Sequence, residues 1–405
     1  MPYRPANQSG PPASGPQPGS LLRRLREAPQ DAVNRIAGEI GARRATSLGE
    51  AQAAAYLDGR LRRAGLRVSA DAFRAPAGVG WDGLALALLA FVGVILYYWV
   101  PLPSLALSVW NCAIAVVGFL RPSNQFLTHK RPSQNVIATR ALEAAPRWRV
   151  VLLAPLDTPP ATRQIVRRLS AGMQLLLGRM IACAAITVLA LLAFFGPFEV
   201  RLLLWYAQFV AVAYLIMLAV LEAWQLRAPA TAGAANHAGA LAAMLESADT
   251  LNTLTQTELW AVALGATDSG AGLADLLRRY PFDPLMTLFI GLESIGSGLL
   301  SYVTREGRLP QRSADPLLVR LVAETDAADP LINVEPRPYY SEPTLIYALH
   351  RARYRNLTII GLNGDGSPAQ RGSPTDTPDQ IDAEMIDRAV RLIVGIVKLI
   401  DTTEL

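Results

Sequence analysis

The chain has 405 residues, of which 51% are hydrophobic and 18% charged, and its formal net charge is +5. The charged fraction lies below the roughly 25% that is usual for soluble domains, and the mean hydropathy is positive at +0.25, so a disordered protein and a purely soluble one are both disfavoured. The basic residues are spread along the chain instead of clustering, which argues against nucleic acid as a partner.

In chain order, residues 1–30 form a Pro/Gly/Ser-rich stretch without the apolar core of a signal peptide, which predicts a disordered tail. Helical periodicity and short β-type runs then alternate through the polar part of the chain. Helices are predicted at 48–64, 236–251, 268–279 and 382–399, and strands at 67–73, 135–139, 148–153, 259–264, 286–291 and 357–361. This alternation predicts an α/β domain of three layers, in which helices cover both faces of a mostly parallel mixed sheet.

Two regions, 82–120 and 176–224, lose almost all charge. Each is long enough for two helices of about 20 residues, the length that a bilayer core requires. Prolines at 101 and 103 break the first region, and Gly196-Pro197 breaks the second. We therefore predict two transmembrane helical hairpins, with four transmembrane helices in all and the lipid bilayer as a partner. The remaining segments, 31–80, 122–173 and 226–405, are then expected to form one domain together.

The charges beside the hairpins predict their orientation. Basic residues flank both hairpins, whereas the turns between paired helices carry only Glu199 and Arg201. The flanking residues are Arg74, Arg121, Lys130, Arg131, Arg163, Arg167, Arg168, Arg179 and Arg227. By the positive-inside rule, the domain and the N-terminus are expected in the cytoplasm, with the hairpins in the inner or plasma membrane. A transporter is disfavoured because the ionisable groups of the apolar runs, Arg179 and Glu222, stand only at their edges.

The order of five segments in the polar part of the chain is informative about the fold. They are APLD at 154–157, AANHAGALAAMLE at 234–246, LGATDSG at 264–270, LESIGSG at 292–298 and GSPTDTPDQID at 372–382. In this order they resemble the landmarks of the co-catalytic zinc exopeptidase family, which includes aminopeptidases, glutamate carboxypeptidase, glutaminyl cyclase and transferrin receptor. The resemblance covers nearly all of the chain outside the hairpins. It implies a site with two zinc ions held by two histidines, a bridging aspartate and two further carboxylates, with a glutamate as general base.

Several of these functional positions are occupied by residues that cannot do the family's chemistry. The resemblance places the first histidine ligand on Pro155, the bridging aspartate on Asn236, the general base on Thr267 and the last histidine on Gly372. Proline and glycine offer no side-chain donor atom, and an amide cannot bridge two cations as a carboxylate does. The resemblance therefore implies that no catalytic residue is present and that no metal or other cofactor is expected.

Some polar residues of the family's site remain. The expected residual pocket comprises Asp157, Asn236, His237, Asp268, Glu293 and Asp376. Because transferrin receptor and nicastrin likewise lack a working metal centre within this family, the resemblance implies a pseudoenzyme. We expect a membrane protein that acts as a binding or scaffold protein with a protein or peptide partner.

The alternative is a divergent membrane-anchored metallo-aminopeptidase, or another hydrolase, with a rebuilt single-metal site. His237 at the pocket rim, together with Asp268 and Glu293, would suit one zinc ion. The simpler interpretation makes His237 a polar residue at the start of a helix that Asn236 caps. His350, in a segment rich in arginine, is expected on a solvated basic face, and His129 at the membrane boundary.

Overall fold

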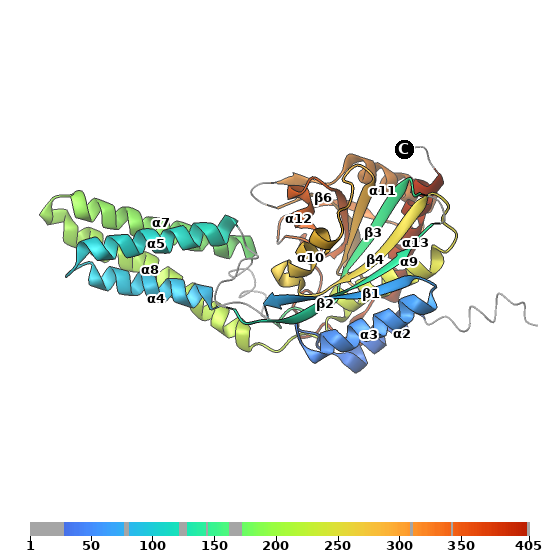
Figure 1. The fold of residues 1–405 in the computed structure, drawn as a ribbon, viewed down its shortest axis with the longest axis horizontal. Helices are drawn as coiled ribbons and strands as arrows, with labels where there is room; N and C mark the ends of the chain where they lie inside the picture. The colour runs from blue at the N-terminus through green and yellow to red at the C-terminus, as the bar shows by residue number, and fades with distance from the viewer. Residues whose placement is uncertain are drawn as a thin grey trace, which may run out of the picture.

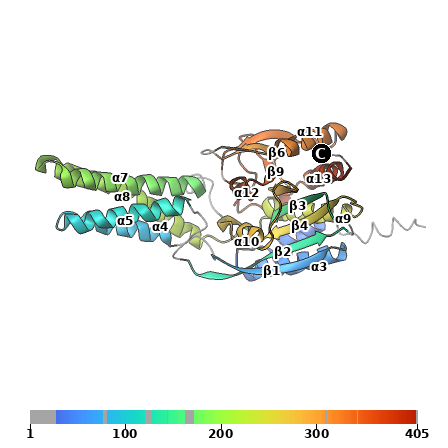
Figure 2. The same cartoon turned by 45° about the horizontal axis from the view of Figure 1, so that its top comes forward.

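The computed structural model describes residues 28–76, 81–120, 128–142, 145–161, 172–307, 311–341 and 343–402. They form an α/β domain from which a bundle of apolar helices extends on one side (Figures 1 and 2). The predicted tail lies almost entirely outside the described residues. So do Arg121, Arg163, Arg167 and Arg168, on which the predicted orientation partly depends.

The described part of the domain is built on a nine-stranded mixed sheet with the order β1-β2-β4-β3-β5-β9-β6-β7, and β8 pairs with β6. The strands are β1 (Arg67–Pro76), β2 (Lys130–Arg140), β3 (Trp148–Pro155), β4 (Thr257–Leu264), β5 (Thr287–Glu293), β6 (Leu299–Glu306), β7 (Arg312–Ser313), β8 (Glu335–Tyr339) and β9 (Arg355–Leu362). The central strands β4, β3, β5 and β9 are parallel. Their apolar runs are continuous because both faces are covered. The predicted α/β class with a parallel-centred mixed sheet is thus confirmed.

Helices cover both faces of this sheet. One face carries α2 (Pro29–Val33), η1 (Asn34–Ile40), α3 (Leu48–Arg63), α9 (Gly239–Thr250), α11 (Pro316–Ala328) and α13 (Ala383–Thr402); the other carries α10 (Ala271–Arg279) and α12 (Tyr347–Arg351). Along β3, Leu152 joins the first core while Leu153 joins the second. Successive side chains of a strand point to opposite faces, so one short apolar run supplies both cores.

The bundle consists of α4 (Asp82–Leu96), α5 (Pro101–Leu120), α7 (Gly172–Phe195) and α8 (Phe198–Arg227). Within the described residues, three helices are long and apolar enough to cross a membrane: Pro101–Leu120, Leu175–Phe195 and Phe198–Gln225. The fourth, α4, has 15 residues and spans about 22 Å, less than the hydrocarbon core of about 30 Å. The structure therefore differs from the predicted four transmembrane helices of about 20 residues each. The helix α4 is shorter because it already ends at Leu96, whereas α5 begins only at Pro101.

Polar groups join the helices inside the bundle. The Asn111 side chain donates to the carbonyl of Leu86 at 3.1 Å, and the Trp205 indole donates to the carbonyl of Val94 at 2.7 Å. Arg179 of α7 pairs with Glu222 of α8, and their side chains are only 8% and 5% exposed. Arg179 and Glu222 lie near the ends of the apolar spans Leu175–Phe195 and Phe198–Gln225, where they are nonetheless shielded from solvent. Antiparallel packing of α7 on α8 brings them together inside the bundle.

Candidate functional site

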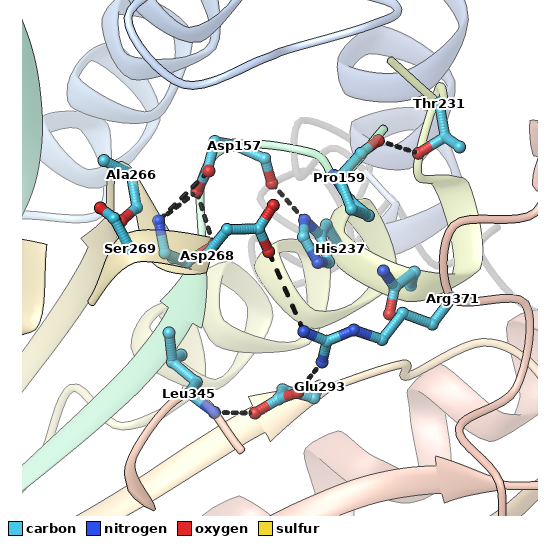
Figure 3. Close-up of polar contacts among 12 residues, drawn as sticks. Asp157, Pro159, Thr231, His237, Ala266, Asp268, Ser269, Glu293, Leu345 and Arg371 are labelled. Carbon is cyan, nitrogen blue, oxygen red and sulfur yellow. Dashed lines mark hydrogen bonds and ion pairs between the residues drawn. The ribbon is translucent and has the colours of Figure 1, made fainter. Parts of the chain in front are cut away.

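The residues predicted to form a pocket come from loops at the carboxyl ends of the central parallel strands. Asp157 follows β3, Asp268 lies in η3 (Thr267–Ser269) after β4, and Glu293 ends β5. His237 lies in η2 (Ala234–Ala238), the turn that precedes α9. Because parallel strands end at one edge of the sheet, these side chains gather in one place (Figure 3).

Arg371 lies between Asp268 and Glu293, the two carboxylates that the resemblance places at zinc-ligand positions. One nitrogen of its guanidinium is 3.1 Å from a Glu293 oxygen, and the other is 4.0 Å from an Asp268 oxygen. The Glu293 side chain is 5% exposed and Arg371 17%, whereas Asp268 is 51% exposed. The backbone N–H of Leu345 donates to the second Glu293 oxygen. The site thus contains an internal cation (Figure 3).

Sequence reasoning missed Arg371. Its signal was present, because this arginine directly precedes Gly372, the position at which the family has its last histidine. A cationic side chain next to a lost ligand position can pair with the carboxylates that would otherwise bind the metal. Nothing in a linear pattern, however, showed that its side chain would turn toward Asp268 and Glu293.

Asp157 is buried beneath the site and is held by Thr267. The Thr267 backbone N–H donates to it at 3.0 Å and the Thr267 hydroxyl at 2.7 Å. Burial, followed by the nearby charges of Asp268 and Glu50, raises the pKa of Asp157 to about 8. The Thr267 hydroxyl, which the resemblance places where the family has its general base, therefore donates to a buried carboxyl group.

His237 is buried at 5% exposure and does not lie at the rim as expected. Its Nδ1 atom contacts the backbone carbonyl of Asp157, so Nδ1 carries the proton and donates. Burial and the positive charge of Arg371 lower the His237 pKa to about 3. The imidazole is therefore neutral at physiological pH.

The helix that contains His237 is not capped by Asn236, so that expectation is wrong. Asn236 lies inside η2, where its side-chain oxygen accepts from the Ser294 hydroxyl at 2.7 Å. The cap is Asp376, which accepts from the N–H groups of Ala235 at 2.6 Å and Asn236 at 3.2 Å. Burial raises the Asp376 pKa to about 6 despite these bonds. A carboxylate 140 residues away in sequence replaced the local cap.

The two chain segments that lead into and out of the α7–α8 hairpin run beside this site. Ala161 N–H donates to the carbonyl of Pro229 at 2.7 Å, and Thr231 N–H donates to that of Pro159 at 3.1 Å. Asp157 precedes the outgoing segment, and His237 follows the returning one. The His237–Asp157 bond therefore closes the base of the hairpin.

Backbone strain is concentrated here. Of the six non-glycine residues with positive φ in the described chain, three border the site: Ala266 at 48°, Ser294 at 50° and Gln370 at 56°. Each such conformation costs on the order of 1 kcal/mol or more. These loops keep a specific strained geometry, although the family's ligands are absent from them.

The donor atoms of this site do not fit zinc. Pro155 ends β3 without a side-chain donor, and Gly372 has no side chain at all. No group of three or more His, Cys, Asp and Glu residues in the described chain is placed to hold a metal ion. A catalytic zinc ion usually has about three protein ligands. Here the guanidinium of Arg371 lies between Asp268 and Glu293 and pairs with both carboxylates.

The raised pKa values predict an unusual dependence of stability on pH. Asp157 ionises near its ordinary value of 3.8 when unfolded, but only near 8 when folded. The folded state therefore binds more protons between these values, so the free energy of unfolding should fall as pH rises from about 5 to 8. Asp157→Asn keeps an acceptor for Thr267 and should flatten this slope in denaturant titrations at pH 5, 6.5 and 8. An unchanged slope, equal to that of the surface control Asp58→Asn, would refute the assignment.

The fold is similar to that of solved exopeptidases over nearly the whole chain. A zinc aminopeptidase from Bacillus subtilis matches with a TM-score of 0.57 at 11% identity, covering 93% of this chain and 95% of that one. Glutaminyl cyclase from Porphyromonas gingivalis matches with a TM-score of 0.55 at 13% identity, covering 92% and 96%. An aminopeptidase from Aneurinibacillus sp. strain AM-1 gives 0.54 at 13% identity, covering 92% of each.

No protein-family model matches the chain, and no curated protein matches it either. At these identities the structural matches establish the zinc aminopeptidase and glutaminyl cyclase fold. They say nothing by themselves about catalysis.

Proposed function

We propose that this chain is an integral membrane protein whose exopeptidase-like domain works by binding a protein or peptide partner and not by metal-dependent hydrolysis. The observation that carries the proposal is the position of Arg371, whose guanidinium lies between Asp268 and Glu293. The two carboxylates are the family's ligand positions that keep a donor atom here. An arginine there supplies positive charge without an open coordination position for water or substrate.

Electrostatics supports this interpretation. The guanidinium stays protonated at any physiological pH, so a divalent cation between the same carboxylates would be repelled at short range. In a partly buried site, such repulsion is screened far less than in water. Thr267 offers a hydroxyl that already donates to Asp157, so it does not accept a proton from water as the family's glutamate does.

The apolar helices support a membrane location. Three of them reach the length and hydropathy of membrane spans, and the basic residues beside them favour a cytoplasmic domain under the positive-inside rule. The domain would then sit on the cytoplasmic surface of the inner or plasma membrane. Because the hairpin segments are bonded together beside Asp157 and His237, partner binding at the site would be coupled to the position of α7 and α8.

Metal analysis tests this proposal. The full-length protein, purified in detergent and dialysed against zinc, should retain no stoichiometric zinc by elemental mass spectrometry. It should also release no amino acid from unblocked dipeptide amides. The matched positive control is the triple variant Asn236→Asp, Arg371→Ala and Gly372→His, which restores two donors and removes the internal cation. This variant should gain zinc relative to the wild type.

The same experiment identifies the alternative. Stoichiometric zinc in the wild type, lost together with activity in His237→Ala, would establish a rebuilt single-metal hydrolase and overturn the proposal. Zinc retained by His237→Ala would also contradict the proposal, and it would place the ion elsewhere in the chain.

A further inference from the structure

A cavity far from the candidate site lies where β7, α11 and the start of β9 meet. It is a surface pocket open to solvent, with a volume of about 430 Å³. It is lined by Gln311, Arg312, Ser313, Ala314, Asp315, Pro316, His350, Arg353, Tyr354, Arg355 and Asn356. Three arginines and one carboxylate therefore face it, which gives the lining an excess of positive charge.

We propose that this cavity binds a phosphate-bearing group. Arg312 and Arg353 are exposed and form no ion pair with any other described residue, so their guanidinium groups are available. Arginine is suited to phosphate because its planar fork donates two parallel hydrogen bonds to phosphate oxygens. The Ser313 hydroxyl lies in the same lining and adds a neutral donor.

The acidic residue of the lining does not cancel this charge. Asp315 accepts from the backbone N–H groups of Leu317 at 3.0 Å and Leu318 at 3.3 Å, so it caps α11. Its other oxygen lies 4.0 Å from Arg355. The carboxylate is thus engaged by partners of its own.

The floor of the cavity is rigid and polar. His350 was expected on a solvated face, but its side chain is 9% exposed and its Nε2 lies 2.6 Å from Glu306. Glu306 also accepts from the Thr344 hydroxyl at 2.6 Å, and Asn356 is buried beneath His350. Arg353 stands at φ 59°, a conformation that is rare for an arginine. Its backbone N–H donates to the carbonyl of His350 at 3.3 Å.

One helix beside the cavity contacts the apolar bundle. The adjacent helix α12 is on the side of the domain nearest the bundle in both views (Figures 1 and 2). Arg351 of α12 donates to the carbonyl of Leu120, the last residue of α5, at 3.4 Å. If α5 crosses a bilayer, Leu120 and the Arg351 side chain that contacts it lie near its surface. The phosphate could thus belong to an anionic lipid or to a soluble phosphate ester, and the chemistry of the cavity is the same for both.

The test uses full-length protein in a neutral detergent, titrated by isothermal calorimetry with inorganic phosphate, glycerol phosphate and dihexanoyl phosphatidic acid. We expect binding to weaken about tenfold in Arg312→Gln and in Arg353→Gln, since each loses one charge-assisted contact, and further in the double variant. Arg320→Gln, which removes an exposed arginine of α11 paired with Glu324, should bind as the wild type does. Equal melting temperatures will show that the variants are folded.

The three probes distinguish the source of the phosphate. Binding of phosphatidic acid alone identifies a lipid headgroup site, and binding of the two soluble probes identifies a site for a phosphate ester. Either result supports the proposal. It is overturned if the wild type binds none of the three at millimolar concentration, or if the double variant binds as tightly as the wild type.

Discussion

Replacing Arg371 by alanine should lower the free energy of unfolding of the domain by about 3 kcal/mol, the lower end of what breaking a buried ion pair costs. The physical reason is that Glu293, whose side chain is 5% exposed, would lose the guanidinium that lies 3.1 Å from its carboxylate. Asp268, being half exposed, would lose little. Denaturant unfolding in detergent, followed by tryptophan fluorescence from Trp148 and Trp260, measures the loss.

Two variants control this measurement. Arg371→Ala combined with Glu293→Gln should recover part of the loss, because the buried side chain with which Arg371 pairs is then neutral. Arg391→Ala removes an arginine from an exposed pair with Asp329 and should cost no more than about 1 kcal/mol. If Arg371→Ala is no more destabilising than Arg391→Ala, the internal cation does not support the site.

Replacing Glu222 by alanine should destabilise the helical bundle by about 3 kcal/mol or more. The change leaves Arg179 charged between apolar helices, where the pair is almost completely shielded from solvent. The melting temperature of the full-length protein in detergent should fall accordingly. Arg179→Met combined with Glu222→Met should be far less harmful, since no unpaired charge remains. A single variant as stable as this double variant would contradict the assignment.

The same ion pair explains why α4 has a glycine at position 83. A Cβ atom on Gly83 would meet the Arg179 guanidinium and the Glu222 carboxylate, so Gly83→Val should separate the pair and destabilise the bundle as well. The matched control is Gly118→Ala on α5, where an added Cβ meets no atom within 4 Å. Equal melting temperatures for the two variants would mean that close approach of α4 is unimportant.

Local patterns predicted most of the regular structure. The helix at 48–64 and the strands at 67–73, 148–153 and 259–264 agree with α3, β1, β3 and β4, within a few residues at their ends. These segments have strong periodicity. The order of the five landmark segments then indicated which fold the helices and strands form. The strands β6, β7 and β8 were missed. β7 has two residues, and β8 contains two prolines, which disfavour a strand in any local pattern.

The candidate site likewise has features that the sequence predicted and features that it did not. The composition and the apolar runs predicted helices that interrupt an α/β domain, and the resemblance to the zinc exopeptidase family implied that Pro155, Asn236, Thr267 and Gly372 stand at ligand and base positions. What these four residues can donate to a metal follows from the sequence, because a residue's donor atoms are fixed by its chemistry.

What replaces those ligands was decided by tertiary structure. Arg371 meets Glu293 across 78 residues, Asp376 caps η2 across 140, and Arg179 meets Glu222 only when α7 and α8 pack antiparallel. Charges that are distant in sequence become partners when burial removes water as their competitor. Which charges pair depends on where the folded chain places them, and a local sequence pattern does not contain that information.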